Sequence, residues 1–420
     1  MILNLQTIFR RSINNILLYL AAVSRYHSYL ISAKEILQRY NGQEPFASFL
    51  KKYFAANKKF GSKDRKQVSH LCYCFFRLGK AVMNVSLEEK LLTALFLCSS
   101  ESNQILEALK PEWNEKCEIP LHEKLLIINY SLLITELFPW NDELSDGIDQ
   151  EKFFESFLVQ PDLFLRLRPG KEKAVKQKLL QAAIEYKIIS DNCLALPNSS
   201  KIGIIIELDK EAVIQDYNSQ RIGEFLYNLK PQSSNFKQIV WDCCAGSGGK
   251  SIMIYDLNPE VELTVSDIRE SILANLKKRF AIAGIENYKS FVTDLVKNKS
   301  EIANLQSDII IADVPCTGSG TWSRTPEQLY YFDDRKIENY ASIQKKIVLN
   351  VIPHLQPGGS FIYITCSVFK KENEEVVEFI KENLPAGKAG FNLQIKQMEL
   401  LKGYDKKADS MFAAVMERSL

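Results

Sequence analysis

The chain has 420 residues, of which 46% are hydrophobic and 25% are charged, and its net charge is +2. This length exceeds that of a typical single domain and predicts two or three domains. The composition is ordinary for a globular protein with a sizeable core, and the sequence shows no internal repeat and no low-complexity segment. No apolar stretch is long enough to span a bilayer, so we expect no membrane partner. The nearly balanced charge indicates no partner by itself.

The nine cysteines are an odd number, and none of them forms a Cys-x-x-Cys pair. This spacing disfavours a zinc ribbon or a thioredoxin-type motif, so we expect no metal site. Free thiols in this number are typical of a reducing compartment, which predicts a cytoplasmic protein.

The N-terminal third is predicted to be helical. Residues 1–27 form an extension or a first helix, in which Arg10 and Arg11 precede a short apolar run from Ile16 to Val23. This pattern loosely resembles a signal peptide or an amphipathic presequence, but the short run favours a helix. Residues 28–150 are predicted to form a helical domain, because apolar side chains recur there at helical spacing.

The remainder divides into two α/β parts. Residues 151–235 are predicted to form a small α+β domain, with a strand at 163–167 and a helix at 171–186. Residues 236–420 alternate strand and helix patterns, which predicts a Rossmann-like, doubly wound sheet. The expected strands are Ile239–Cys243, Glu262–Ser266, Ser290–Thr293, Asp308–Ala312 and Ser360–Thr365.

A glycine-rich turn follows the first of these strands and lets the backbone approach a ligand closely. It comprises Cys244, Ala245, Gly246, Ser247, Gly248, Gly249 and Lys250. A P-loop would need glycine in place of Cys244, and a dinucleotide fingerprint would need glycine in place of Ser251. Both ligand classes are therefore disfavoured, and a plain tight turn remains the alternative.

Acidic residues end the second and third strands. Asp267 lies about 20 residues after the glycines, where a carboxylate can accept hydrogen bonds from the ribose hydroxyls of an adenosine. Asp294 stands at the same rim and could contact the adenine amino group. Together with the turn they outline an adenosine site, which S-adenosylmethionine and NAD would both fit.

Two thiols follow the fourth and fifth strands. Cys316 comes after Asp313-Val314-Pro315, and Cys366 comes after Thr365. Cysteine is often a buried apolar residue. These two differ from the others because each leaves a strand at the carboxyl edge of a parallel sheet, where ligands bind. We therefore predict that this pair is functional.

Several motifs in order carry a family resemblance. They are Gln215-Asp216-Tyr217-Asn218-Ser219-Gln220, Cys244 to Lys250, Asp313-Val314-Pro315-Cys316-Thr317-Gly318 with Arg324 and Pro326-Glu327, Thr365-Cys366-Ser367 with Glu372-Asn373-Glu374, and Asp409-Ser410-Met411-Phe412-Ala413. From Gln215 onward the chain resembles the RsmB/Nop/NSUN family of RNA cytosine-5 methyltransferases. It departs from the family pattern at Gly246, Ser247 and Ser323, where the family usually has alanine, proline and arginine.

The resemblance implies a site and a mechanism. S-adenosylmethionine would bind the turn from Cys244 to Lys250 together with Asp267, Asp294 and Asp313. Cys366 would be the nucleophile that adds to carbon 6 of cytosine, which activates carbon 5 for attack on the methyl group. Cys316 would help release the product. Asp313 would hold or protonate ring nitrogen 3, with Lys250 assisting nearby.

Two basic clusters are candidate RNA contacts. The first comprises Lys51, Lys52, Lys58, Lys59, Lys63, Arg65, Lys66, Arg77 and Lys80, with Tyr53, Phe54, Phe60 and Tyr73 interleaved; the second comprises Arg166, Arg168, Lys171, Lys173 and Lys176. A solvated helix face is the alternative reading of the first. Phe60-Gly61-Ser62-Lys63-Asp64-Arg65 resembles the NusB-like domain of RsmB-type enzymes, which favours ribosomal RNA.

The target cytidine must be single-stranded or flipped to reach two thiols. We expect a monomer. One competing hypothesis is an RNA-binding ribosome-assembly factor that has lost catalysis, and another is an NAD-linked oxidoreductase. The intact pair of Cys316 and Cys366 argues against both.

Overall fold

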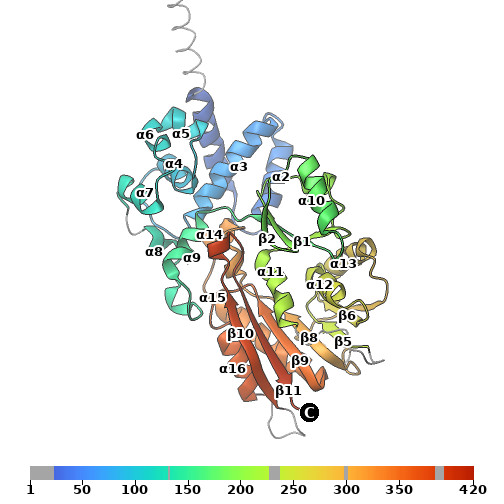
Figure 1. Ribbon diagram of the computed structural model, residues 1–420. Helices are drawn as coiled ribbons and strands as arrows, with labels where there is room; N and C mark the ends of the chain where they lie inside the picture. Colours follow the sequence, from blue (N-terminus) through green and yellow to red (C-terminus); the bar gives the residue numbers. More distant parts are fainter. Residues whose placement is uncertain (1–22, 131–132, 227–236, 298–300, 384–391) are drawn as a thin grey trace, which may run out of the picture. The chain divides into compact units, whose positions relative to one another are not determined.

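The structure is a computed structural model that describes residues 23–130, 133–226, 237–297, 301–383 and 392–420 (Figure 1). The prediction for the first residues, including the apolar run from Ile16, lies almost wholly outside this part. The chain forms two compact units. The first comprises Met1–Pro139, Gln150–Val159 and Thr325–Phe332, and the second comprises Trp140–Asp149, Gln160–Arg324 and Asp333–Leu420.

The first unit is helical, as predicted. Residues 23–39 form a helix. It is followed by α2 (Phe46–Ala56), α3 (Ser62–Arg77), α4 (Leu87–Cys98), α5 (Gln104–Leu109), α6 (Pro111–Asn114), α7 (Leu121–Ile127), α8 (Leu133–Leu137), α9 (Gln150–Phe157) and α14 (Pro326–Tyr331). Helix α3 begins where Asp64 accepts a hydrogen bond from the Gly61 backbone N–H at 3.0 Å, which satisfies one of the free donors of the first turn.

Helix α14 joins this unit although it lies between two strands of the second unit in sequence. Its Pro326 occupies the first turn, where a missing N–H costs nothing. Its aromatic side chains pack on α3, with the Tyr330 and Phe75 rings 5.4 Å apart and the Tyr331 and Phe76 rings 6.1 Å apart. These contacts make α14 part of the aromatic core of the helical unit.

The second unit contains a small antiparallel sheet in the order β2-β3-β1-β4. Its elements are β1 (Leu163–Leu167), α10 (Glu172–Gln181), β2 (Lys187–Ser190), β3 (Cys193–Leu196) and β4 (Ala212–Ile214). Helix α10 covers the sheet through Val175 and Leu179, which pack against Leu165 and Leu194. The predicted α+β composition of this segment is confirmed.

The larger sheet has seven strands in the order β10-β11-β9-β8-β5-β6-β7. They are β5 (Ile239–Asp242), β6 (Glu262–Asp267), β7 (Tyr288–Val292), β8 (Ser307–Asp313), β9 (Leu355–Thr365), β10 (Leu393–Leu401) and β11 (Met411–Arg418). Strands β5 to β9 are parallel, whereas β11 is antiparallel to both β9 and β10. The predicted doubly wound mixed sheet is confirmed.

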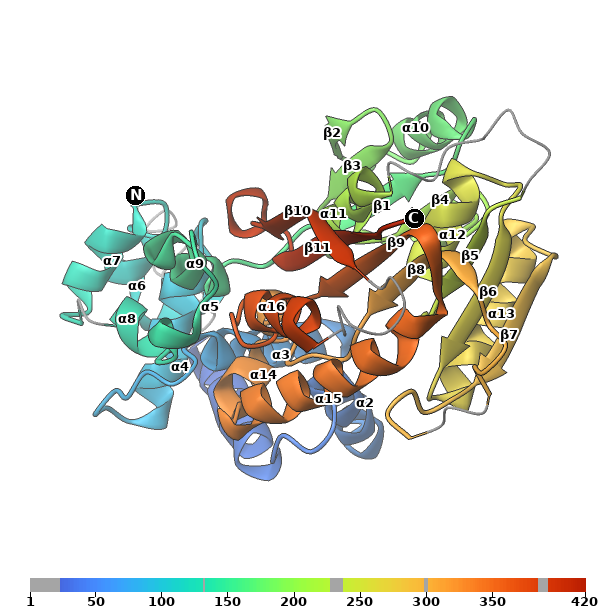
Figure 2. The same ribbon diagram turned by 90° about the horizontal axis from the view of Figure 1, so that it is seen from below.

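Helices cover both faces of this sheet, because the buried side chains of each central strand alternate between them. The helices of the unit are α11 (Tyr217–Arg221), α12 (Gly249–Leu257), α13 (Glu270–Ala283), α15 (Arg335–Val351) and α16 (Glu374–Asn383). In β8, Ile309 and Ile311 face α12 and α13, whereas Ile310 and Ala312 face α15 and α16. Figure 2 shows α15 and α16 lying over one face.

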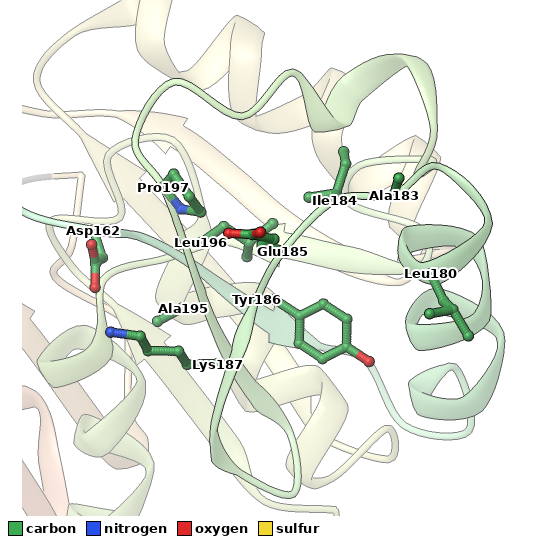
Figure 3. A pocket seen from close by; sticks show the side chains of 10 residues that line it. All are labelled: Asp162, Leu180, Ala183, Ile184, Glu185, Tyr186, Lys187, Ala195, Leu196 and Pro197. Carbon is green, nitrogen blue, oxygen red and sulfur yellow. The ribbon is translucent and has the colours of Figure 1, made fainter.

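A cavity of about 840 Å³ opens on the small sheet (Figure 3). Its lining is largely apolar, with Tyr186, Leu180 and Ile184 on one side and Pro197 and Leu196 on the other. It contains none of the predicted site residues, which lie instead at the carboxyl edge of the large sheet. Among the described residues, no helix combines the length and the apolar character that crossing a membrane requires.

Candidate active site

The glycine-rich turn joins β5 to α12 and depends on two glycines. Gly246 and Gly248 have φ angles of +53° and +83°, a region that side chains with a Cβ rarely adopt. A Cβ on Gly248 would also lie 2.8 Å from Phe280 and 2.9 Å from Leu276. The turn therefore packs directly on α13, and its backbone N–H groups lie at the start of α12, where anionic or polar ligand groups are favoured.

Ser247, at the position where the resembled family usually has proline, is held by a side chain from α13. The Arg279 guanidinium donates to the Ser247 carbonyl oxygen at 2.8 Å and to its hydroxyl at 3.0 Å. The same guanidinium forms an ion pair with Asp209 at 2.6 Å. Because Arg279 is itself oriented, this contact stiffens the turn without proline.

Asp267 ends β6 beside the turn. Its carboxylate accepts hydrogen bonds from the Gly246 N–H at 2.9 Å and from the Arg269 guanidinium at 2.9 and 3.0 Å. Burial opposes ionisation of this carboxyl, but the Arg269 hydrogen bonds outweigh it and lower its pKa. Asp294 lies just after β7, half-buried, and accepts from the Val296 N–H at 3.0 Å. The structure thus brings both predicted carboxylates to the edge that carries the turn.

Lys250, in the first turn of α12, and Asp313, at the end of β8, form an ion pair of 2.6 Å. Burial disfavours the ammonium, but the Asp313 carboxylate outweighs burial and raises the pKa of Lys250. Next to them Asp242 is 1% exposed and accepts a hydrogen bond from the Ser251 hydroxyl at 2.6 Å. Burial raises the pKa of Asp242 to about 7. Its second oxygen has no hydrogen-bond partner within the described part of the chain.

The two thiols meet at this edge, since the Cys316 and Cys366 sulfurs lie 3.2 Å apart. Both side chains are partly exposed, unlike most of the other cysteines. The hydrogen bond with Cys366, together with burial, raises the pKa of Cys316 well above its usual range. Lys250 is near enough to Cys366 for the two groups to interact electrostatically.

Arg324 connects two motifs of the family resemblance, the one that contains Asp216 and the one that contains Asp409. Its guanidinium donates to Asp216 at 3.0 Å and to Asp409 at 3.2 Å, which joins the start of α11 to the segment before β11. Burial, followed by repulsion from Asp216, raises the pKa of Asp409 to about 7. Close by, a Cβ on Gly320 would lie 2.0 Å from the Ser410 carbonyl oxygen, so that the loop after Cys316 packs tightly on the same segment.

The second basic cluster is largely internal. Arg166 and Arg168 form ion pairs with Asp256 of α12 at 2.5 and 2.8 Å, and all three side chains are buried. The prediction that these two arginines contact RNA is therefore wrong, because their charges are already used to join β1 to the large sheet. Lys171 and Lys173 are exposed.

The first basic cluster lies on the helical unit and is mostly on the surface. The side chains of Lys51, Lys52, Lys58, Lys59, Lys63, Arg65 and Lys66 are exposed. Arg77 is 3% exposed and donates to the Phe157 and Val159 carbonyl oxygens, so its prediction as an RNA contact is wrong. The interleaved aromatic residues Tyr53, Phe54 and Phe60 are buried core residues.

Comparison with known proteins agrees with this geometry. Residues 226–416 match the model of the family described as 16S rRNA methyltransferase RsmB/F. This part of the chain is therefore similar to the RsmB/F family. The RsmB/F-like part is 33% identical over 170 residues to "Ribosomal RNA small subunit methyltransferase B" of Proteus mirabilis and 32% identical over 174 residues to that of an Enterobacter species. These matches cover 39% and 40% of the chain, and the chain spans only 37% and 38% of those relatives.

Solved structures share the fold over a larger part of the chain. A protein described as PH0851 superposes with a TM-score of 0.65 and 16% identity, over 94% of this chain and 98% of that one. A methyltransferase homologue from Pyrococcus horikoshii gives a TM-score of 0.54 and 20% identity, over 70% of this chain and 98% of that one. The predicted fold class is confirmed, and the match over residues 226–416 supports the predicted family and, with it, S-adenosylmethionine as the cofactor.

Some residues at the site were not singled out from the sequence. Asp242 falls inside a predicted strand, and only the structure shows its buried carboxyl with one unpartnered oxygen beside Lys250. Arg279 stands on a helix among other basic residues and carries no local signal. Among the described residues no group of side chains is arranged to hold a metal ion.

Proposed function

We propose that this protein transfers a methyl group from S-adenosylmethionine to carbon 5 of a cytidine in ribosomal RNA. The observation that carries the proposal is the 3.2 Å approach of the Cys316 and Cys366 sulfurs at the sheet edge that also bears the glycine-rich turn. A second thiol beside the nucleophile has no use in a simple cofactor-binding fold. It suits a reaction in which a covalent bond to the substrate has to form and then break.

The described residues fit S-adenosylmethionine. The turn from Cys244 to Lys250 offers close backbone approach, Asp267 offers a partly buried carboxylate for the ribose hydroxyls, and Asp294 stands where the adenine would lie. The unpartnered oxygen of Asp242 offers an acceptor for a polar group of the cofactor. The cofactor supplies an electrophilic methyl group, and the protein has to supply the activated cytosine.

In the proposed mechanism the Cys366 thiolate adds to carbon 6, and the electrons of the 5,6 double bond become available at carbon 5. As negative charge builds on nitrogen 3, a proton moves from the Lys250 ammonium through the paired Asp313 carboxyl to that nitrogen. After methyl transfer a base takes the carbon 5 proton, the electrons of that C–H bond re-form the 5,6 double bond, and Cys366 leaves as a thiolate; Cys316 assists this release. The raised pKa of Cys316 supports the division, since a thiol that resists ionisation is suited to donate a proton during release.

Ribosomal RNA is proposed as the substrate because the relatives are named ribosomal RNA methyltransferases and because the helical unit presents an exposed basic surface. We propose that the target cytidine is flipped or single-stranded, and that the enzyme acts as a monomer in the cytoplasm. Replacing Lys58, Lys59 and Lys63 by glutamate should weaken RNA binding and flatten its salt dependence while cofactor affinity is unchanged. Unaltered RNA affinity at low salt would remove this surface from the proposal.

Bisulfite sequencing of total RNA, with and without the gene, tests the function directly. Loss of one protected cytidine in ribosomal RNA is expected on deletion, and the Cys366→Ala variant should not restore it although it still binds S-adenosylmethionine. An unchanged bisulfite pattern would favour the competing function, a ribosome-assembly factor without catalysis.

The division of labour between the thiols has its own test. Cys316→Ala should form the covalent bond to RNA but release it slowly, so a protein–RNA adduct should survive denaturing electrophoresis. The Cys316→Ala/Cys366→Ala double variant should form no adduct. An adduct in Cys366→Ala and none in Cys316→Ala would reverse the two roles.

A further inference from the structure

One buried carboxylate lies behind both thiols. Glu372 is 0% exposed and stands between the end of β9 and the start of α16. It accepts hydrogen bonds from the Thr317 backbone N–H at 2.9 Å, from the Thr317 hydroxyl at 2.5 Å, from the Ser367 hydroxyl, and from the Gln344 amide at 3.1 Å. A buried carboxylate with this many donors is fully satisfied and rigidly held.

The donors are the direct neighbours of the thiols. Thr317 follows Cys316, and Ser367 follows Cys366. The two cysteine-bearing loops come from strands whose sequence positions differ by about 50 residues, and their separation is not set by the chain itself. Since one carboxylate accepts from both loops, any change in the distance between the loops has to break a charge-assisted hydrogen bond.

The surroundings of Glu372 support the same separation. The Gln344 amide that contacts Glu372 also donates to the Pro315 carbonyl oxygen at 3.0 Å, on the other side of Cys316. The Ser319 and Ser367 hydroxyls lie 3.1 Å apart, which ties the loops a second time. Gln344 thus holds the backbone before Cys316, and Glu372, which also accepts from Ser367, holds the backbone after it.

We propose that Glu372 is a positioning residue that sets the spacing of Cys316 and Cys366 by clamping Thr317 and Ser367. Its consequence for methyl transfer rests on the proposed function; the spacing itself does not. Both sulfurs must reach one cytosine ring, and a shift of about 1 Å in such a constellation can cost roughly 100-fold in rate.

The length of the side chain at position 372 decides whether it can accept hydrogen bonds from both thiol loops. Glu372→Asp is shorter by one methylene and cannot reach both loops, whereas Glu372→Gln keeps the shape and one acceptor oxygen. We expect Gln to retain more function than Asp or Ala. A matched control is Glu374→Ala, because Glu374 is a partly buried carboxylate of the same segment that accepts from Ser145 at 2.8 Å instead of from Thr317 or Ser367.

The spacing can be measured without catalysis by dibromobimane, which becomes fluorescent when one molecule alkylates two neighbouring thiols. The signal of the Cys316→Ala variant gives the background from the other cysteines. Above that background, Glu372→Ala and Glu372→Asp should lose most of the cross-linking, Glu372→Gln should keep more of it, and Glu374→Ala should behave as wild type. Cofactor affinity serves as a check that each variant is folded.

In the methylation assay, Glu372→Asp should slow adduct formation by about 100-fold at unchanged cofactor affinity. Wild-type cross-linking in folded Glu372→Ala or Glu372→Asp would overturn the proposal. The same loss in Glu374→Ala as in Glu372→Ala would overturn it as well, since the effect would then be general. If wild type cross-links in a manner that depends on Glu372 but methylates no RNA, the clamp stands and the proposed function fails.

Discussion

Replacing Asp267 by alanine tests the assignment of the adenosine site. In the structure this carboxylate is 6% exposed and accepts from the Gly246 N–H and from the Arg269 side chain. For two ribose hydroxyls to bind, the Arg269 guanidinium has to leave. The measured effect is therefore the gain from the ribose bonds minus the loss of the Arg269 contact.

The gain from the ribose hydrogen bonds is larger than the loss of the Arg269 contact. Hydrogen bonds to a charged group contribute about 1.5–3 kcal/mol each, whereas an ion pair with a partner as exposed as Arg269, at 60%, contributes only about 0–1 kcal/mol. Allowing for bonds that the solvated ribose gives up, we expect Asp267→Ala to weaken binding by about 1–3 kcal/mol, or roughly 5- to 150-fold in Kd.

Isothermal titration calorimetry with S-adenosylmethionine measures this effect. Arg269→Ala is the informative partner, because removing the competing guanidinium should leave affinity unchanged or raise it by up to about fivefold. Unchanged affinity in Asp267→Ala would refute the ribose assignment. Weaker binding in Arg269→Ala would show that the guanidinium supports the site instead of competing for it.

Three further outcomes are expected. Arg279→Ala should weaken cofactor binding by releasing the turn at Ser247, and calorimetry should show a less favourable entropy; equal affinity would mean that the turn is rigid by itself. Asp256→Ala leaves two buried guanidinium groups unpaired and should cost about 3–5 kcal/mol of unfolding free energy in urea, whereas a loss below about 1 kcal/mol would contradict their burial. Because burial raises the pKa of Asp242 from 3.8 to about 7, the native state keeps a proton that the unfolded chain loses, so stability should fall as pH rises through this window and Asp242→Asn should remove the fall.

Local patterns in the sequence determined much of the site. The glycine turn, the carboxylates Asp267 and Asp294, and the two cysteines all stand at strand ends, and alternation of strand and helix is enough to predict that such ends share one edge of a parallel sheet. The five parallel strands of the large sheet and the helical N-terminal part followed from the same periodicity. Side-chain type and spacing along the chain carry this information directly.

Only the tertiary structure decided which residues distant in sequence form ion pairs and hydrogen bonds with one another. The sequence predicts Arg166 and Arg168 as surface charges, whereas the structure pairs both with Asp256 of α12. Helix α14 carries no sequence signal that assigns it to the helical unit. The reach of Glu372 to both thiol loops is likewise invisible in the sequence. The physical reason is that burial and ion pairing depend on which surfaces pack together, and local propensity does not encode that choice.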